Sequence, residues 1–136
     1  MNNSIMSIGE AASRSGVPPK TIRYYEEIGL IARAERLENR YRAYDQNDVE
    51  TLRFIQRARS LGFAIKEVAE LLALYRDRRR ASRNVKQLAL AHVAALDRKV
   101  AELTAIRNTI ADLAERCHGD QRPECPILEQ LENPGH

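Results

Sequence analysis

The segment 82–116 constrains the fold more than any other part of this chain, because it lacks glycine and proline and consists mainly of strong helix formers. We predict a single helix there, about 50 Å long at the usual rise of about 1.5 Å per residue. Apolar residues spaced three and four apart form a stripe, interrupted at Arg107, that consists of Val93, Leu96, Val100, Leu103, Ile110 and Ala114. The preceding residues 1–81 are too few to cover a stripe of that length. The spacing therefore predicts a parallel or antiparallel coiled-coil dimer, with packing on the chain's own domain as the alternative.

Local signals before this segment predict short helices. Ser7 can cap a helix that runs to about Ser15, with Glu10 reaching back to it. Gly16 and Pro18 mark a tight turn, after which a second helix runs from Pro19 to Ile28 and ends at Gly29. Two short helices joined by a glycine-containing turn indicate a helix-turn-helix, although any small helical hairpin would have the same pattern.

The pattern changes after this pair of helices. Residues 30–44 predict a short β-hairpin with its turn at 38–40. The sequence from Asp45 to Asp48 predicts the start of a third helix, which ends near Gly62. A fourth helix follows, with one apolar face made of Ile65, Val68, Leu71 and Leu72. The charged run 76–80 is predicted to be a linker or an exposed helix end.

Charge and composition exclude several classes of protein. Residues 1–81 carry 15 Lys and Arg against 11 Asp and Glu, whereas residues 82–136 carry 7 against 8, so the basic excess lies in the first part and suits a polyanionic partner there. No apolar run approaches the length of about 18 residues that a membrane span needs, and no signal peptide is visible, which favours a cytoplasmic protein without membrane contact. We find no catalytic Ser/His/Asp set, phosphate-binding glycine loop or carboxylate pair, so we do not expect an enzyme.

Two cysteines, Cys117 and Cys125, lie near the C-terminus with seven residues between them. In a reducing compartment such a pair indicates a metal or redox site. Thiolates suit soft ions, and two of them can hold a monovalent ion linearly, whereas structural zinc normally takes four ligands. His118, Asp120 and Glu124 are the nearby residues that could complete a larger set, and His118 is equally explained as an exposed loop residue. A disulfide between the two cysteines is the redox alternative.

Three stretches resemble the MerR family of bacterial transcription regulators: TIRYYEEIGLI at 21–31, NRYRAY at 39–44 and RARSLGF at 57–63. The resemblance covers nearly the whole chain, and the segment CHGDQRPECPIL at 117–128 is similar to the copper-efflux-regulator branch. One departure is Arg40, where the family usually has a glycine in its wing turn; another is the missing proline in the first wing strand. Glycine allows a positive φ in such a turn, whereas arginine adopts it only at a cost.

The resemblance implies a mainly α fold in four parts. These are a winged helix-turn-helix DNA-binding domain over 1–75, a linker over 76–81, a long antiparallel coiled-coil dimerisation helix over 82–116, and a metal-binding loop with a short C-terminal helix or tail over 117–136. It also implies that the second helix enters the major groove of promoter DNA. The DNA-binding residues it implies are Lys20, Thr21, Arg23, Tyr24, Tyr41, Arg42 and Arg59. Tyr25 is expected in the core instead.

The same resemblance implies a metal-responsive activator. Cys117 and Cys125 would bind Cu(I), Ag(I) or Au(I), and the metal-bound homodimer would bend and untwist promoter DNA so that RNA polymerase can use it, activating copper efflux or tolerance genes. Relatives that sense divalent ions usually have a third cysteine where this chain has Ser82, which would approach the partner's loop in an antiparallel dimer. That serine disfavours a divalent sensor. A divalent-metal sensor and a thiol redox switch of the same fold stay as alternatives.

Overall fold

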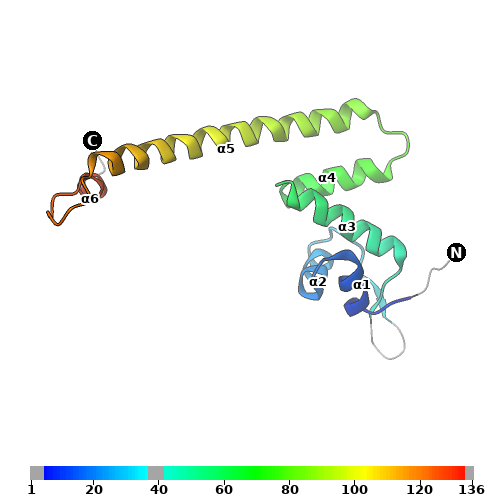
Figure 1. Ribbon diagram of the computed structural model, residues 1–136. Coiled ribbons are helices and arrows are strands. Elements are labelled where there is room, and N and C mark those ends of the chain that lie inside the picture. Colours follow the sequence, from blue (N-terminus) through cyan, green and yellow to red (C-terminus); the bar gives the residue numbers. More distant parts are fainter. Residues whose placement is uncertain (1–4, 37–41, 134–136) are drawn as a thin grey trace. The chain divides into compact units, whose positions relative to one another are not determined.

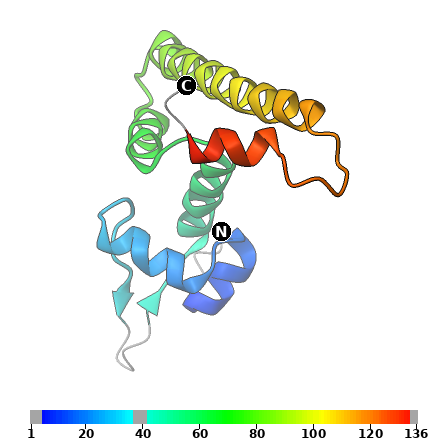
Figure 2. The same cartoon turned by 90° about the vertical axis from the view of Figure 1, so that its left-hand side faces the viewer.

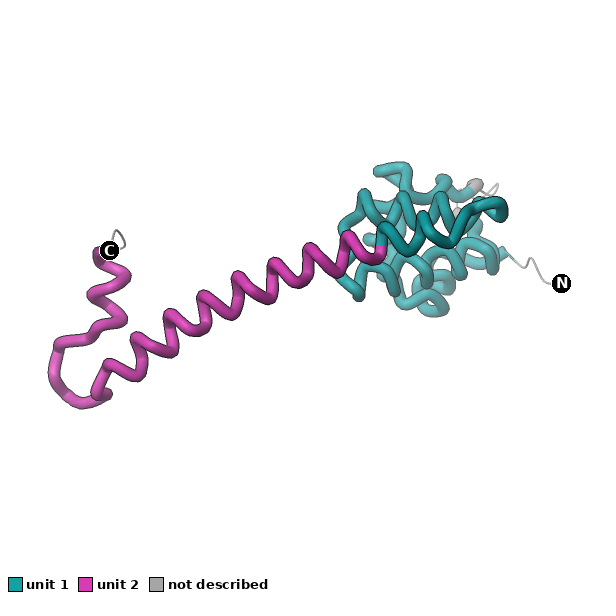
Figure 3. The backbone as a smooth tube through the Cα atoms, turned by 90° about the horizontal axis from the view of Figure 1, so that it is seen from above, with its two compact units in different colours: residues 1–88 teal, residues 89–136 magenta. Residues whose placement is uncertain are grey.

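The computed structural model describes residues 5–36 and 42–133, which are mainly helical (Figure 1). The elements are α1 (Ile8–Ser15), α2 (Pro19–Glu27), β1 (Glu35–Arg36), β2 (Arg42–Ala43), α3 (Gln46–Ser60), α4 (Ile65–Arg76), α5 (Ser82–Arg116) and α6 (Pro126–Glu132). The chain forms two compact units, 1–88 and 89–136, whose boundary lies within α5 (Figure 3). None of the described helices is long and apolar enough to cross a membrane.

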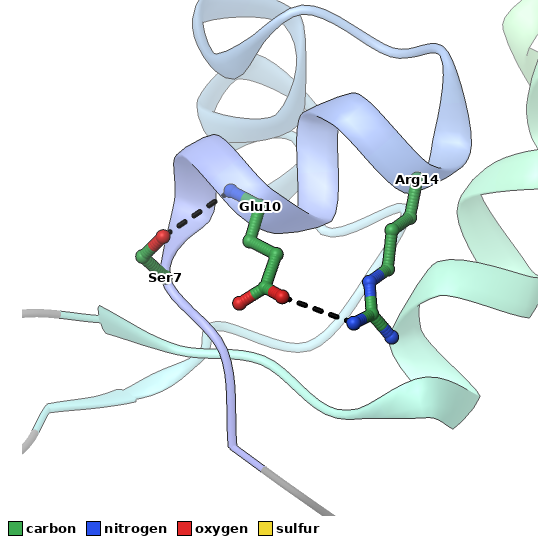
Figure 4. A network of polar contacts seen from close by, with 3 residues as sticks. All are labelled: Ser7, Glu10 and Arg14. Carbon is green, nitrogen blue, oxygen red and sulfur yellow. Dashed lines mark hydrogen bonds and ion pairs between the residues drawn. The ribbon is translucent and has the colours of Figure 1, made fainter.

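The start of α1 confirms half of the predicted cap. The Ser7 hydroxyl accepts a hydrogen bond from the Glu10 backbone N–H at 3.2 Å (Figure 4). The Glu10 carboxylate, which we expected to reach back to Ser7, instead accepts from Arg14 Nη2 at 3.0 Å. Arg14 lies one helical turn further on, where opposite charges four residues apart attract each other. The ion pair therefore takes the carboxylate that a reciprocal cap would need.

The turn between α1 and α2 has the geometry that its sequence predicts. Gly16 ends α1 with φ of 81°, a left-handed conformation that other residues adopt only under strain. The Val17 backbone N–H then donates to Ser15 Oγ at 3.2 Å, and Pro19 begins α2. The predicted helix-turn-helix is confirmed.

The predicted hairpin is also confirmed, as a pair of two-residue antiparallel strands that Figure 2 draws as short arrows. Glu35 pairs with Ala43, and Arg36 with Arg42. Just beyond β2, Tyr44 exchanges two backbone hydrogen bonds with Met6, 2.7 and 2.9 Å long, which ties the chain before α1 to the hairpin. The turn that we predicted at 38–40, including Arg40, lies outside the described residues.

One hydrophobic core holds the helix-turn-helix, the hairpin and the next two helices together. Its buried residues are Met6, Ala11, Val17, Ile22, Tyr25, Leu30, Tyr44, Val49, Leu52, Ile55, Ala58, Val68 and Leu72. The predicted burial of Tyr25 is confirmed, and so is the apolar face of α4, with Ile65 and Leu71 packed at the margin of the core. A reciprocal cap between Asp45 and Asp48 begins α3, and burial raises the pKa of the Asp48 carboxyl.

Glu26 connects α2 to the hairpin. Its side chain is buried, and its two carboxylate oxygens accept from the Tyr44 hydroxyl at 2.9 Å and from the Ala34 backbone N–H at 2.7 Å. Tyr44 is itself buried and begins the segment that leads into α3. These bonds hold the hairpin at a set position beside α2.

We expect Glu26→Ala to lower the free energy of unfolding by about 2–4 kcal/mol, because the buried Tyr44 hydroxyl and Ala34 N–H lose a charged acceptor. Urea unfolding followed by circular dichroism, at one fixed protein concentration, measures the change. Glu27→Ala is the matched control, since Glu27 is the exposed neighbour on the same helix and should change stability by less than about 0.5 kcal/mol. Equal stabilities of the two variants would contradict the role given to Glu26.

Helix α5 begins at Ser82 and ends at Arg116, as predicted. Its stripe is exposed in the single chain: Val100 and Leu103 have 62% and 66% of their surface accessible. Leu90 and Ile106, which we did not assign to the stripe, are also exposed, whereas His92 is buried. A large apolar surface on one helix of a monomer is unusual in water. The described chain thus leaves the predicted coiled-coil face available to a partner.

Candidate functional site

Helix α2 has a buried face and an exposed face. The buried face consists of Ile22, Tyr25 and Glu26. Three of the residues we assigned to DNA are exposed, namely Lys20, Arg23 and Tyr24, and a fourth, Thr21, is half-buried. Two cations, an aromatic ring and a hydroxyl therefore lie together on the second helix of a helix-turn-helix. A nucleic-acid backbone and base edges are suitable ligands for such a surface.

Of the other three residues assigned to DNA, Arg59 is the one whose side chain the structure describes. Arg59 is exposed near the end of α3, where its Nη1 donates to the Phe63 carbonyl at 2.7 Å. That bond holds the guanidinium beside the turn into α4. Arg42 belongs to β2 through its backbone, but its side chain is not described, and Tyr41 lies outside the described residues. The contributions of Tyr41 and Arg42 stay predictions.

The two cysteines meet in the loop between α5 and α6. Cys117 directly follows α5, Cys125 directly precedes α6, and their sulfur atoms are 3.9 Å apart. Both are free thiols and half-buried. Gly119, with φ of 67°, turns the chain, and Asp120 accepts from the Arg122 backbone N–H at 2.9 Å and from its Nε at 2.8 Å. This short turn brings the thiols together, as the sequence predicted.

Local hydrogen bonds favour the thiolate form of Cys125. Backbone N–H groups at the start of α6, above all that of Leu128, lower the pKa of the Cys125 thiol, and the neighbouring Cys117 thiol adds to the effect. These N–H groups have no acceptor within the helix, so they are free to stabilise a negative sulfur. Hydrogen bonds from Arg122 likewise lower the pKa of the Asp120 carboxyl. The loop therefore places a thiol of lowered pKa beside a second thiol.

The donor set at this loop consists of two sulfurs. Among the described residues, no group of three or more His, Cys, Asp and Glu side chains is placed to hold a metal ion. His118 adjoins Cys117 but is exposed. Ser82 is the exposed first residue of α5, and its place near a partner's loop stays a prediction. Two soft ligands without a third suit a soft monovalent ion better than zinc, which normally takes four.

A helix-turn-helix with a β-hairpin wing, followed by a long helix with an exposed apolar stripe, defines a class of DNA-binding regulators. Two family models match this chain: one for the MerR HTH family of regulatory proteins over residues 6–74, and one for MerR DNA binding over residues 49–113. The chain belongs to the MerR family.

Similar proteins agree with this assignment. The chain is 56% identical over 128 residues to the heavy metal-dependent transcription regulator 2 of Rhizobium meliloti (strain 1021), covering 94% of this chain and 87% of that protein. It is 40% identical to the HTH-type transcriptional regulator CueR of Salmonella typhimurium (strain LT2), covering 93% and 91%. The crystal structure of PbrR691 from Ralstonia metallidurans CH34 in complex with lead(II) matches with a TM-score of 0.80 at 32% identity, covering 93% and 98%. The named relatives are transcription regulators, not enzymes.

Sequence reasoning missed Glu26. The available signal was its position four residues after Ile22, on the apolar face of α2, where a carboxylate needs buried hydrogen-bond donors. The donors come from Ala34, eight residues further along the chain, and from Tyr44, eighteen residues further along and beyond the hairpin. Without the fold, nothing in the sequence says that these groups meet.

Proposed function

We propose that this chain is a metal-responsive transcriptional activator that binds promoter DNA as a homodimer and responds to Cu(I), with Ag(I) and Au(I) as ions of the same chemistry. Acting on promoter DNA together with RNA polymerase, it would work in the cytoplasm. The observation that carries the proposal is the pair of half-buried sulfurs of Cys117 and Cys125, 3.9 Å apart, without a third ligand among the described residues. The names of the relatives support a metal response in general.

Within this proposal each part of the chain has one role. Cys117 and Cys125 would hold the ion through their thiolates, and the ion would supply metal–thiolate coordination at this loop. Because Cys117 directly follows α5 and Cys125 directly precedes α6, holding both sulfurs would restrain α6 against the end of α5. The α2 face and the hairpin bind DNA at two half-sites related by the dimer's two-fold axis. A changed dimer geometry then alters DNA bending and twist, which activates copper efflux or tolerance genes.

Two alternatives are supported by particular observations. The likeness to a lead(II) complex supports a divalent-metal sensor, although Ser82 replaces the third thiol that such sensors usually have. The short distance between the sulfurs also supports a redox switch, in which two thiols form a disulfide of about 2.05 Å and pass two electrons and two protons to an oxidant such as a peroxide.

Titration of the reduced protein in the absence of oxygen separates the three functions. We expect one tightly bound Cu(I) per subunit in competition with a chelator, much weaker Zn(II) and Pb(II), and Cu(I)-dependent transcription from the target promoter with purified polymerase. Equal or tighter binding of Zn(II) or Pb(II) would favour the divalent sensor. Activation by peroxide in metal-free solution would favour the redox switch. Either result would overturn the Cu(I) proposal.

A further inference from the structure

Arg107 interrupts the apolar stripe of α5 at a position where an apolar residue is expected. The neighbouring stripe residues, which form the seam of the predicted coiled coil, are Leu103 and Ile110, and both are more than half exposed in the single chain. Arg107 is exposed too, and its Nη1 donates to Asn108 Oδ1 at 3.0 Å. We propose that Arg107 forms an ion pair with Asp97 of the partner subunit, and that this pair fixes both the direction and the register of the dimer. The inference rests on the proposed homodimer.

The direction follows from Arg107 itself. In a parallel two-stranded coil, identical seam positions face each other, so two Arg107 guanidinium groups would meet in the interface. Two like charges held at such short range and partly removed from water repel each other. In an antiparallel pair the seam positions instead face different residues, and the two arginines lie apart on opposite sides of the two-fold axis. The position of this one residue therefore favours the antiparallel dimer.

The register follows from symmetry of the stripe. The stripe of α5 alternates spacings of three and four residues, and this order is the same in both chain directions. Two antiparallel copies therefore bring their stripes into register when the two-fold axis passes between residues 101 and 102. The facing pairs are then Val93 with the partner's Ile110, Val100 with the partner's Leu103, and Leu96 with the partner's Arg107. Apolar side chains cover each other in the first two pairs. In the third pair the Arg107 guanidinium lies beside a leucine, which offers it no hydrogen-bond acceptor.

Asp97 supplies that acceptor. On the facing helix, one row of residues runs along the edge of the seam next to Arg107. These residues recur every seven positions and are Leu90, Asp97, Thr104 and Ala111. Asp97 is the one carboxylate of the four, and it directly follows Leu96, the residue that faces the partner's Arg107. Sliding the seam by one heptad would place Leu90 or Thr104 beside Arg107 instead. One register therefore neutralises both arginines of the dimer.

The single chain leaves Asp97 available for this contact. Asp97 is exposed, and the described residues make no hydrogen bond or ion pair with it. Asp112 and Asp120 already pair within the chain with Arg116 and Arg122, and the exposed Glu102 and Glu115 of α5 do not occupy positions that flank the stripe. An unpaired acid at the edge of an uncovered apolar stripe matches a basic group on the facing copy.

Charge reversal tests the ion pair. In the full-length, reduced, metal-free protein, we expect Arg107→Asp to raise the dimer dissociation constant about tenfold or more, because two ion pairs become two repulsions. Adding Asp97→Arg to the same chain should restore it to within about threefold of wild type. Arg98→Asp is the matched control, since Arg98 lies on the side of α5 away from the stripe. The same Arg→Asp substitution there lowers the helix propensity of α5 by the same amount. Sedimentation equilibrium measures all four proteins.

Cross-linking tests the register independently, in chains that also carry Cys117→Ser and Cys125→Ser. Mixed Val93→Cys and Ile110→Cys chains should form a disulfide-linked heterodimer, whereas mixed Val93→Cys and Leu103→Cys chains should not. Cross-linking of the second mixture alone, or no rescue by the double charge reversal in a protein that dimerises, would overturn this inference and leave the Cu(I) proposal standing. A wild-type protein that stays monomeric would overturn the proposed dimer as well.

Discussion

Replacing Cys117 by serine should lower the Cu(I) affinity of the reduced protein by more than about a hundredfold. Changes to groups that only support a metal ligand cost about tenfold to a hundredfold, and loss of one of two ligands should cost more. A serine hydroxyl is a hard and weakly acidic donor that does not replace a thiolate for a soft ion. Competition titration against a Cu(I) chelator measures the change, and Cu(I)-dependent transcription should disappear with it.

The control for this experiment is His118→Ala. His118 is next to Cys117 in the same loop but is exposed, so its replacement tests whether any change near the sulfur disturbs the site. We expect its Cu(I) affinity to stay within about threefold of wild type, because no group of three ligands forms among the described residues. If both variants lost Cu(I) equally, His118 would be a ligand. If Cys117→Ser still bound Cu(I) tightly, the two-thiol site would be wrong.

Arg23→Ala should weaken binding to the operator by about 2–6 kcal/mol, which is about thirtyfold or more, because a two-fold dimer loses the contact at both half-sites. Arg23 lies on the exposed face of α2 with its long side chain free to reach a phosphate or a guanine edge. Fluorescence anisotropy with a labelled operator, repeated over a range of salt concentrations, measures both the affinity and its salt dependence.

The salt dependence distinguishes the two contacts. If Arg23 binds phosphate, the slope of log affinity against log salt should fall by about 0.9 per lost contact, or about 1.8 for the dimer, and all DNA sequences should be affected alike. If it contacts guanine, discrimination against a mutated operator should shrink instead. Arg98→Ala on α5 removes the same charge away from α2 and should leave operator affinity within about threefold. Equal effects of the two variants would contradict a direct contact by Arg23.

The candidate sites differ in how far sequence reasoning reached. The outward-facing residues of α2 were predictable, because a helix of known start and phase has a known exposed face once Ile22 and Tyr25 are assigned to the core. The proximity of Cys117 and Cys125 was also predictable, since only a short loop with Gly119 and Pro123 separates them. Glu26 was not, because its partners Ala34 and Tyr44 approach it only when the hairpin folds back against α2.

Element boundaries in this chain were decided by local chemistry and could be read from the sequence. Ser7 and Asp45 cap helices, Gly16 ends one, and the run without glycine or proline produces α5 from Ser82 to Arg116, because each of these signals acts within one or two helical turns. The tertiary structure alone decided the Met6–Tyr44 pairing and the hydrogen-bond partners of the buried Glu26 carboxylate. These contacts join segments that are far apart in the chain, so they form only when the core brings the hairpin beside α1 and α2, and local spacing does not determine them.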